Sequence, residues 1–320
     1  MVEVVVPEAW TPAGLATTLV SLAGQRYPAF NVASVRPQSE AASSDLAGIA
    51  AILEARGHRV RLADLPATAT LGRRRQALLE SVAAPYLLVV DDGLFLEPDL
   101  IGRLVAAIRS TRCGFVGSAV IDLRYRGEHR VNEQAIEFWD GPVRAEDVRV
   151  GTQAWARRRV HRGANLEHLR ERLPRTRDRL YRISDIRGCV LYDTATLRAA
   201  GGFAGLGQAG DGAPLGLEAA AQLRLLAHSG GAGLFPSGAY RVTRAASEPA
   251  SHSWPGADDP WPSADVGSVP VASRWIRRGH IWRQGASARE ARQPRGRQIR
   301  APGVAHHRKV MRAAGGPGES

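Results

Sequence analysis

Two adjacent carboxylates, Asp91 and Asp92, come directly after an apolar run at residues 86–90. The run has the length and the β-branched content of a buried central strand. In open α/β sheets, ligands bind outside the carboxyl ends of the strands, so this pair of acids would lie where a ligand docks. Paired carboxylates at such a place can hold a divalent cation or bind sugar hydroxyls. The alternative is a plain turn at the end of the strand, because Asp-Gly is a common turn pair.

The elements that must position these acids follow from the apolar pattern of the chain. Segments typical of strands occur at residues 2–6, 30–35, 58–62, 86–90, 114–121 and 186–192, with shorter pieces at 233–236 and 239–242. Segments typical of helices occur at residues 13–25, 46–57, 73–83, 99–110, 194–200 and 217–228. Ser44 and Asp45 predict the cap of the second helix. Strands that alternate with helices at this spacing indicate an α/β fold with a mostly parallel sheet flanked by helices.

Several pieces of the chain are informative because of their order. The first three are a strand with its loop at 4–7, a helix at 19–28 that ends at Tyr27-Pro28, and the acidic segment at 88–93 with 97–99. The last two are a strand and helix at 187–191 and 197–203, and a helix at 216–224 that is followed by a strand ending at Pro236. Together they resemble the inverting glycosyltransferases of family two over residues 2–244. The resemblance implies a GT-A (Rossmann-like) domain at 1–244, with a nucleotide-donor half at 1–121 and an acceptor half at 122–244.

The resemblance also implies an activity. A sugar would move from a nucleotide-diphosphate donor to the hydroxyl of a glycan, a lipid-linked molecule or a small molecule, with inversion at the anomeric carbon. The acceptor hydroxyl must lose its proton to a carboxylate, and the leaving diphosphate must be neutralised by a cation. Glu218 matches the family's general base, with Glu in place of Asp, and Asp91 would face the ribose or the sugar. Without the resemblance, Glu218 is an acid in the first turn of a helix, where the helix dipole favours it.

The residues that the resemblance places at the donor site are Pro7, Glu8, Arg36, Arg74, Asp91, Asp92 and Arg241. Four positions depart from the family pattern, and one of them is Leu217, which replaces the first acid of the family's Glu-Asp pair. Gly93 stands where the family has a metal ligand, so Asp92 is the tentative replacement. Arg36 lies where an acid usually binds the base, and Arg241 stands where many members have a metal-binding His.

These departures exchange metal-supporting groups for cations. Arginine suits phosphate because its planar fork binds two oxygens at once. We therefore expect Arg241 and the run at 73–75 to neutralise the diphosphate, with weak or no dependence on Mn²⁺ or Mg²⁺. Each of these arginines could instead be a solvated surface residue. A second interpretation also stays open: a catalytically inactive pseudo-glycosyltransferase that binds a nucleotide or a glycan.

The net charge of +12 is unevenly distributed along the chain. Residues 271–318 hold twelve arginines and lysines and one acid, so the charge of the predicted body does not support nucleic-acid binding. The composition of 245–320 predicts a largely disordered tail, which could contact an anionic membrane or have no function at all. Residues 1–6 lack a basic signal-peptide region, and no apolar stretch is long enough to predict a membrane span. We expect a cytoplasmic protein; if the tail contacts a membrane, it would do so at the inner face.

Overall fold

The structure is a computed structural model. It describes residues 1–7, 11–35, 40–63, 69–122, 136–149, 178–203 and 217–241, together with positions 152, 154, 155, 157, 166 and 170. Glu8, Arg36, the predicted domain boundary at 244 and the predicted tail therefore lie outside the described residues. The two halves at 1–121 and 122–244 remain a prediction as well.

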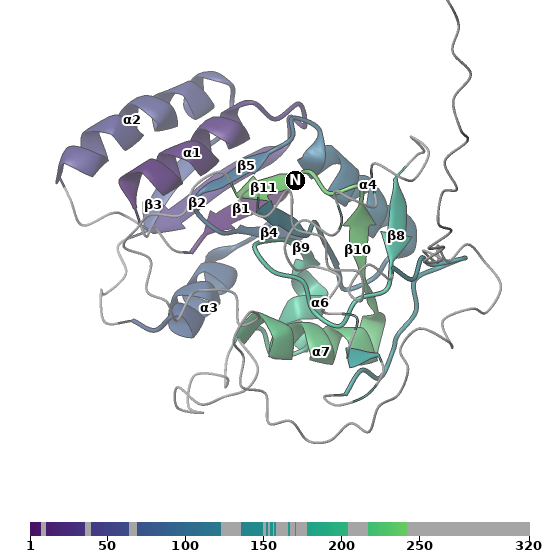
Figure 1. The fold of residues 1–320 in the computed structure, drawn as a ribbon. Coiled ribbons are helices and arrows are strands. Elements are labelled where there is room, and N and C mark those ends of the chain that lie inside the picture. The colour runs from purple at the N-terminus through teal and green to yellow at the C-terminus, as the bar shows by residue number, and fades with distance from the viewer. Residues whose placement is uncertain are drawn as a thin grey trace, which may run out of the picture. The chain divides into compact units, whose positions relative to one another are not determined.

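An eight-stranded sheet forms the centre of the fold. Its strands are β1 (Val2–Val6), β2 (Phe30–Val35), β3 (Val60–Ala63), β4 (Tyr86–Val90), β6 (Phe115–Gly117), β8 (Arg179–Tyr181), β9 (Cys189–Asp193) and β10 (Gly231–Phe235). The order in the sheet is β3-β2-β1-β4-β9-β6-β10-β8 (Figure 1). All neighbours are parallel except those that involve β9 or β8, which are antiparallel. The expected mostly parallel sheet is confirmed, and β1 and β4 are buried at nearly every position, as strands covered on both faces should be.

A second, three-stranded sheet was not predicted. It consists of β5 (Leu94–Leu96), β11 (Ala239–Arg241) and β7 (Val120–Asp122), in that order. The single strand predicted at 114–121 is wrong, because β6 belongs to the large sheet and β7 to the small one. The chain leaves the large sheet at Ser118, whose N–H donates to the carbonyl of Cys189 at 2.9 Å and whose hydroxyl lies 3.1 Å from that of Ser237.

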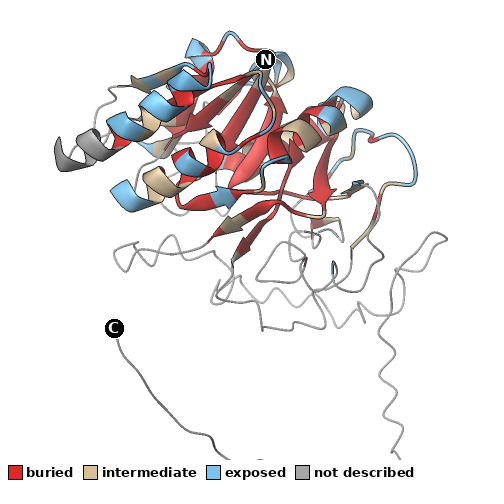
Figure 2. Cartoon of the chain, turned by 90° about the horizontal axis from the view of Figure 1, so that it is seen from above, coloured by how far each residue is buried: buried red, intermediate tan, exposed pale blue. Residues whose placement is uncertain are grey.

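Helices cover both faces of the large sheet, as predicted. Their bounds are α1 (Pro12–Ala23), α2 (Glu40–Ala55), α3 (Leu71–Ser81), α4 (Leu100–Thr111), α6 (Thr194–Ala199) and α7 (Leu217–Ser229). Apolar residues of α1, α2 and α4 pack in one cluster with Val4 and Val6 of β1, and residues of α3, α6 and α7 pack in another with Val5. This division follows from the alternation of side chains along a strand. Figure 2 shows the buried strands between helices whose exposed positions face outward.

The predicted start of the second helix is wrong. Helix α2 begins at Glu40, so Ser44 and Asp45 lie inside it and do not cap it. Glu40 and the two alanines after it are good helix formers, and the helix begins six residues before the predicted range of 46–57. Among the described residues, no helix combines the length and the apolar character needed to cross a lipid bilayer.

Candidate functional site

Asp91 lies at the carboxyl end of β4, where the parallel strand β1 also ends. The Asp91 N–H donates to the carbonyl of Gly188 at 2.8 Å, and the hydroxyl of Thr18 donates to the Asp91 carbonyl at 3.4 Å. Gly188 has a φ of 85°, and a Cβ atom there would lie 3.3 Å from Asp91 Oδ2 and 2.6 Å from Val120 Cγ2. Glycine at position 188 therefore lets the start of β9 approach the carboxylate closely.

Two buried arginines face the two carboxylate oxygens of Asp91. Arg75 Nη2 lies 3.4 Å from Oδ1, and Arg241 Nη2 lies 3.6 Å from Oδ2. The side chains of Arg75 and Arg241 are 6% and 10% exposed, whereas that of Asp91 is 23% exposed. Arg75 belongs to the buried face of α3, and Arg241 ends β11. The structure thus places two cations on the acid that the sequence predicts at the donor site.

Arg75 also contacts Glu218 at the start of α7. The distance from Arg75 Nη1 to Glu218 Oε1 is 3.4 Å, and Oε1 is buried without a hydrogen bond. Burial raises the pKa of Glu218 above its ordinary value; Arg75 opposes this rise, and the negative charge of Asp91 adds to it. Arg75 therefore links the candidate donor-side acid to the candidate general base.

The segment just before β9 supplies a further ion pair near Glu218. Arg187 Nε lies 3.3 Å from Asp185 Oδ2, and the charges of both residues act on the pKa of Glu218, Arg187 lowering it and Asp185 raising it. Gln222, one turn after Glu218, holds this segment in place. Its side chain accepts from the Ile186 N–H at 2.8 Å and donates to the Ile186 carbonyl at 2.7 Å. Sequence reasoning did not select Asp185 or Arg187, because it did not show that β9 runs antiparallel to β4 and so begins where β4 ends.

Asp92 lies against the first turn of α1. It is 3% exposed, and its Oδ2 accepts from the Thr11 N–H at 3.4 Å. A Cβ atom on Gly14 would lie 2.9 Å from the same oxygen. An acid at this end of a helix is favoured by the helix dipole, so Asp92 contributes to the position of α1.

The described residues do not fit a divalent cation at this site. They contain no group of three or more His, Cys, Asp or Glu side chains placed to hold a metal ion. The oxygens of Asp91 face arginines, and Asp92 is turned to a backbone N–H. The tentative assignment of Asp92 as a metal ligand gains no support from this geometry, and no step below is routed through a metal.

The remaining predicted residues are placed as follows. Pro7 is buried directly after β1. Arg74 is half-buried on α3, but the contacts with Asp91 and Glu218 come from its neighbour Arg75. The sequence contains a signal that Arg75, and not Arg74, faces inward. Gly72, Arg75 and the leucines at 78 and 79 form the buried face of α3 at helical spacing, which turns Arg75 inward.

No protein-family model matches the sequence, and no curated protein matches it significantly. Among solved structures, S. aureus TarS 1–349 is similar, with a TM-score of 0.50 at 13% sequence identity. The two chains share a fold. The match covers 75% of this chain and 60% of TarS 1–349, so this chain spans less than two thirds of that structure. The predicted α/β fold class of the GT-A type is thereby confirmed for the described residues.

Two further solved structures are less similar. TarS 1–349 in complex with UDP has a TM-score of 0.48 at 14% identity, with 75% of this chain and 59% of that chain covered. The mannosyltransferase PcManGT from Pyrobaculum calidifontis, in complex with GDP-Man and Mn²⁺, has a TM-score of 0.40 at 13% identity, with coverages of 63% and 47%.

Proposed function

We propose that this protein transfers a sugar from a nucleotide-diphosphate donor to an acceptor hydroxyl, with inversion at the anomeric carbon. We further propose that arginines neutralise the leaving diphosphate in place of a metal ion. One observation carries the proposal: a continuous chain of ion pairs runs from Arg241 through Asp91 and Arg75 to Glu218. It lies at the carboxyl edge of a parallel sheet, where α/β folds bind their ligands.

The donor side of the proposal rests on the two arginines at Asp91. Their ion pairs, at 3.4 and 3.6 Å, are longer than full-strength charge-assisted hydrogen bonds, which measure about 2.7–2.9 Å. A diphosphate carries more charge than a carboxylate, so it competes with Asp91 for the guanidinium groups. Asp91 then accepts from the hydroxyls of the ribose or the sugar. In a site with little water, such cations stabilise the charge that develops on the leaving group.

The acceptor side of the proposal rests on Glu218. Its raised pKa makes the ionised carboxylate a stronger base than an exposed Glu. The carboxylate takes the proton of the acceptor hydroxyl while the hydroxyl oxygen forms a bond to the anomeric carbon. The bond from that carbon to the diphosphate oxygen breaks, and its electron pair leaves with the diphosphate toward Arg75 and Arg241. A single displacement of this kind inverts the configuration of the carbon.

A binder without transferase activity is the competing function, and one observation favours it. Glu218 is 5% exposed and is paired with Arg75, so an acceptor reaches it only after the surrounding side chains move. The acceptor class, the compartment and the membrane contact of the tail also remain predictions from the sequence.

Replacement of the base distinguishes the two functions. With the full-length protein, release of nucleoside diphosphate is measured against a panel of UDP- and GDP-sugars and hydroxyl acceptors. We expect Glu218→Gln to lower turnover by about 10²–10⁴-fold, because a positioned general base contributes about that much, while nucleotide binding is retained. Turnover that survives Glu218→Gln would remove Glu218 from the mechanism. Nucleotide binding by the unsubstituted protein, with no turnover on any donor, would identify a binder.

A further inference from the structure

A cavity lies at the opposite end of the parallel strands from Asp91. It has a volume of about 480 Å³, and it is lined by residues at the starts of β1, β2 and β3 and in the connection from α3 to β4. Its polar lining residues are Glu3, Asn31, Arg59, Arg61 and Ser81. Small-molecule sites commonly measure about 300–1,000 Å³, so the cavity is large enough for a ligand of the size of a monosaccharide.

The floor of this cavity breaks the apolar pattern of the sheet. Glu3 and Asn31 are paired in register, as are Val5 and Ala33 two positions later on the same face. Val5 and Ala33 pack in the apolar cluster beneath α3, but the next positions toward the amino edge hold a carboxylate and an amide. Asn31 is 8% exposed and the Glu3 side chain is 16% exposed. Buried strands of a parallel sheet usually carry Val, Ile or Leu at such positions.

The surrounding contacts do not compensate for burying Glu3. Burial raises the pKa of Glu3, although Arg61, Arg59 and a hydrogen bond from Asn31 act to lower it. Arg61 Nη2 is 3.9 Å from Glu3 Oε1, which is too far for a hydrogen bond, and the Arg61 side chain is 46% exposed. The same nitrogen donates to the Ser81 hydroxyl at 2.8 Å. An ion pair this long and exposed stabilises a fold little, so stability does not explain the acid. Asn31 has a structural contact, because its Oδ1 accepts from the Arg59 N–H at 3.1 Å. Glu3 is therefore the residue that breaks the local rule without an evident structural gain, which is typical of a functional position.

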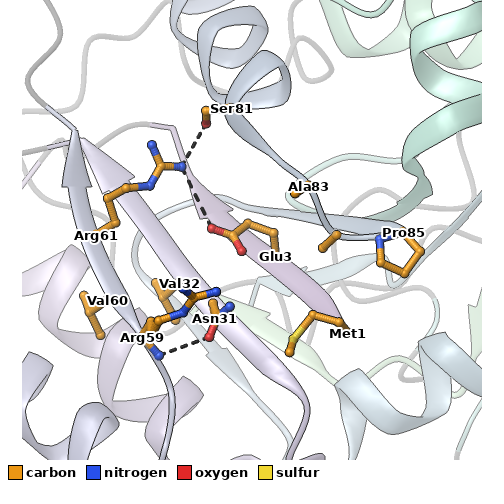
Figure 3. Close-up of a pocket in the computed structure, with 11 residues that line it drawn as sticks. Met1, Glu3, Asn31, Val32, Arg59, Val60, Arg61, Ser81, Ala83 and Pro85 are labelled. Carbon is orange, nitrogen blue, oxygen red and sulfur yellow. Dashed lines mark hydrogen bonds and ion pairs between the residues drawn. The ribbon is translucent and has the colours of Figure 1, made fainter.

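The chemistry of the lining indicates a class of ligand. Arg59 and Arg61 are two positions apart at the start of β3, and they point toward Glu3 from the same face (Figure 3). Two guanidinium groups so placed bind a phosphate through paired N–H donors. The Glu3 carboxylate accepts from ligand hydroxyls and favours them over a second anionic group.

We propose that this cavity, which we call the amino-edge pocket, binds a small hydroxyl-bearing organic phosphate. The phosphate contacts Arg59 and Arg61, and the hydroxyls contact Glu3 and Asn31. The pocket lies at the other end of the strands from the Asp91 site, so the proposal does not depend on sugar transfer.

Calorimetric titration of the full-length protein tests the proposal, with glucose 6-phosphate, glycerol 3-phosphate and inorganic phosphate as probes. We expect at least one organic phosphate to bind with a Kd of about 1 mM or tighter. The double variant Arg59→Ala/Arg61→Ala should weaken this binding by about tenfold or more, because it removes both phosphate contacts. Glu3→Gln should weaken the binding of the organic phosphate but not that of inorganic phosphate, because only the organic phosphate offers hydroxyls to the carboxylate.

A matched control comes from the same stretch of chain. Arg56 is also exposed, at the end of α2, but it does not line the pocket. Arg56→Ala should bind the probes as the unsubstituted protein does. Binding of neither organic phosphate, equal weakening by Arg56→Ala, or unchanged binding in the double variant would each overturn the proposal. If Glu3→Gln bound the organic phosphate as tightly as the unsubstituted protein does, the proposal would be overturned as well, because Glu3 would then make no contact with the ligand.

Discussion

Replacement of Arg75 by methionine should lower the free energy of unfolding, because Arg75 neutralises two carboxylates of the candidate site. Arg75 lies between Asp91 and Glu218 at 3.4 Å from each, and its side chain and that of Glu218 are each 6% exposed. Arg75→Met keeps a long side chain in place but leaves two carboxylates without their shared cation. Breaking a buried ion pair by removing one partner costs about 3–5 kcal/mol. We expect a loss of that size in the free energy of unfolding at pH 8, which is a large part of the roughly 5–15 kcal/mol of a typical domain.

The loss should depend on pH in a defined direction. The pKa of Glu218 in the folded protein already lies above its ordinary value of 4.5, and removal of Arg75 raises it further. A raised pKa means that the folded state binds the proton more tightly than the unfolded state. The stability from this proton is fully present below the unfolded pKa, and it is lost as the pH rises through the folded pKa. The destabilisation by Arg75→Met should therefore be smallest near pH 4.5 and largest at pH 8.

Urea denaturation followed by tryptophan fluorescence measures this effect at both pH values. The double variant Arg75→Met/Glu218→Gln is the decisive comparison, because it removes the cation and the deeply buried charge together. We expect the double variant to be more stable than Arg75→Met alone at pH 8, with little difference between them near pH 4.5. Equal destabilisation by Arg75→Met with and without Glu218→Gln, at both pH values, would refute the electrostatic account of this site.

Three other substitutions test separate parts of the structure. Arg241→Gln should lower kcat/KM for the donor by about 10²–10³-fold, the usual effect of removing one donor that stabilises developing charge, and steady-state kinetics would show it. Gln222→Leu should lower the free energy of unfolding by about 3 kcal/mol or more, because the Ile186 N–H, the Ile186 carbonyl and the Tyr192 hydroxyl each lose a hydrogen bond, at about 1–3 kcal/mol per buried group. An unchanged urea midpoint would contradict this. Gly188→Ala should destabilise more than Gly57→Ala by about 1–3 kcal/mol, because both glycines have a positive φ but only a Cβ at position 188 meets another side chain.

Long apolar strands were predictable from the sequence, and the pairing of short strands into a second sheet was not. The bounds of β1, β2 and β4 agree with the prediction, because each is rich in apolar residues, with Glu3 in β1 and Asn31 and Ser34 in β2 as the polar exceptions. Of the three strands of the small sheet, β11 was expected from residues 239–242, whereas β5 and β7 have no separate signal of their own. They exist because distant segments pair with one another, as Arg241 does with Leu94 and Asp122. A pattern within one segment cannot show a partner more than a hundred residues away.

In the candidate site as well, residues marked by a local pattern were predictable, and those brought in by distant pairing were not. The acid after β4 and the acid that begins α7 were selected from the sequence, and the structure joins Asp91 and Glu218 through one arginine. Within the run of three arginines the prediction singled out Arg74, although the helical spacing from Arg75 to the leucines at 78 and 79 indicates that Arg75 is the one that faces inward. The contribution of residues 185–188 was not predictable, because it depends on β9 running antiparallel to its neighbours.

Turnover of a nucleotide sugar in the presence of EDTA is the most direct test of the arginine-based transfer mechanism. The full-length protein would be assayed with the same donor and acceptor in EDTA and in Mn²⁺. If Arg75 and Arg241 neutralise the leaving diphosphate, the rate should be the same in both conditions, and it should fall in both when Arg241→Gln is introduced. A rate that is abolished by EDTA and restored by Mn²⁺ would contradict the mechanism.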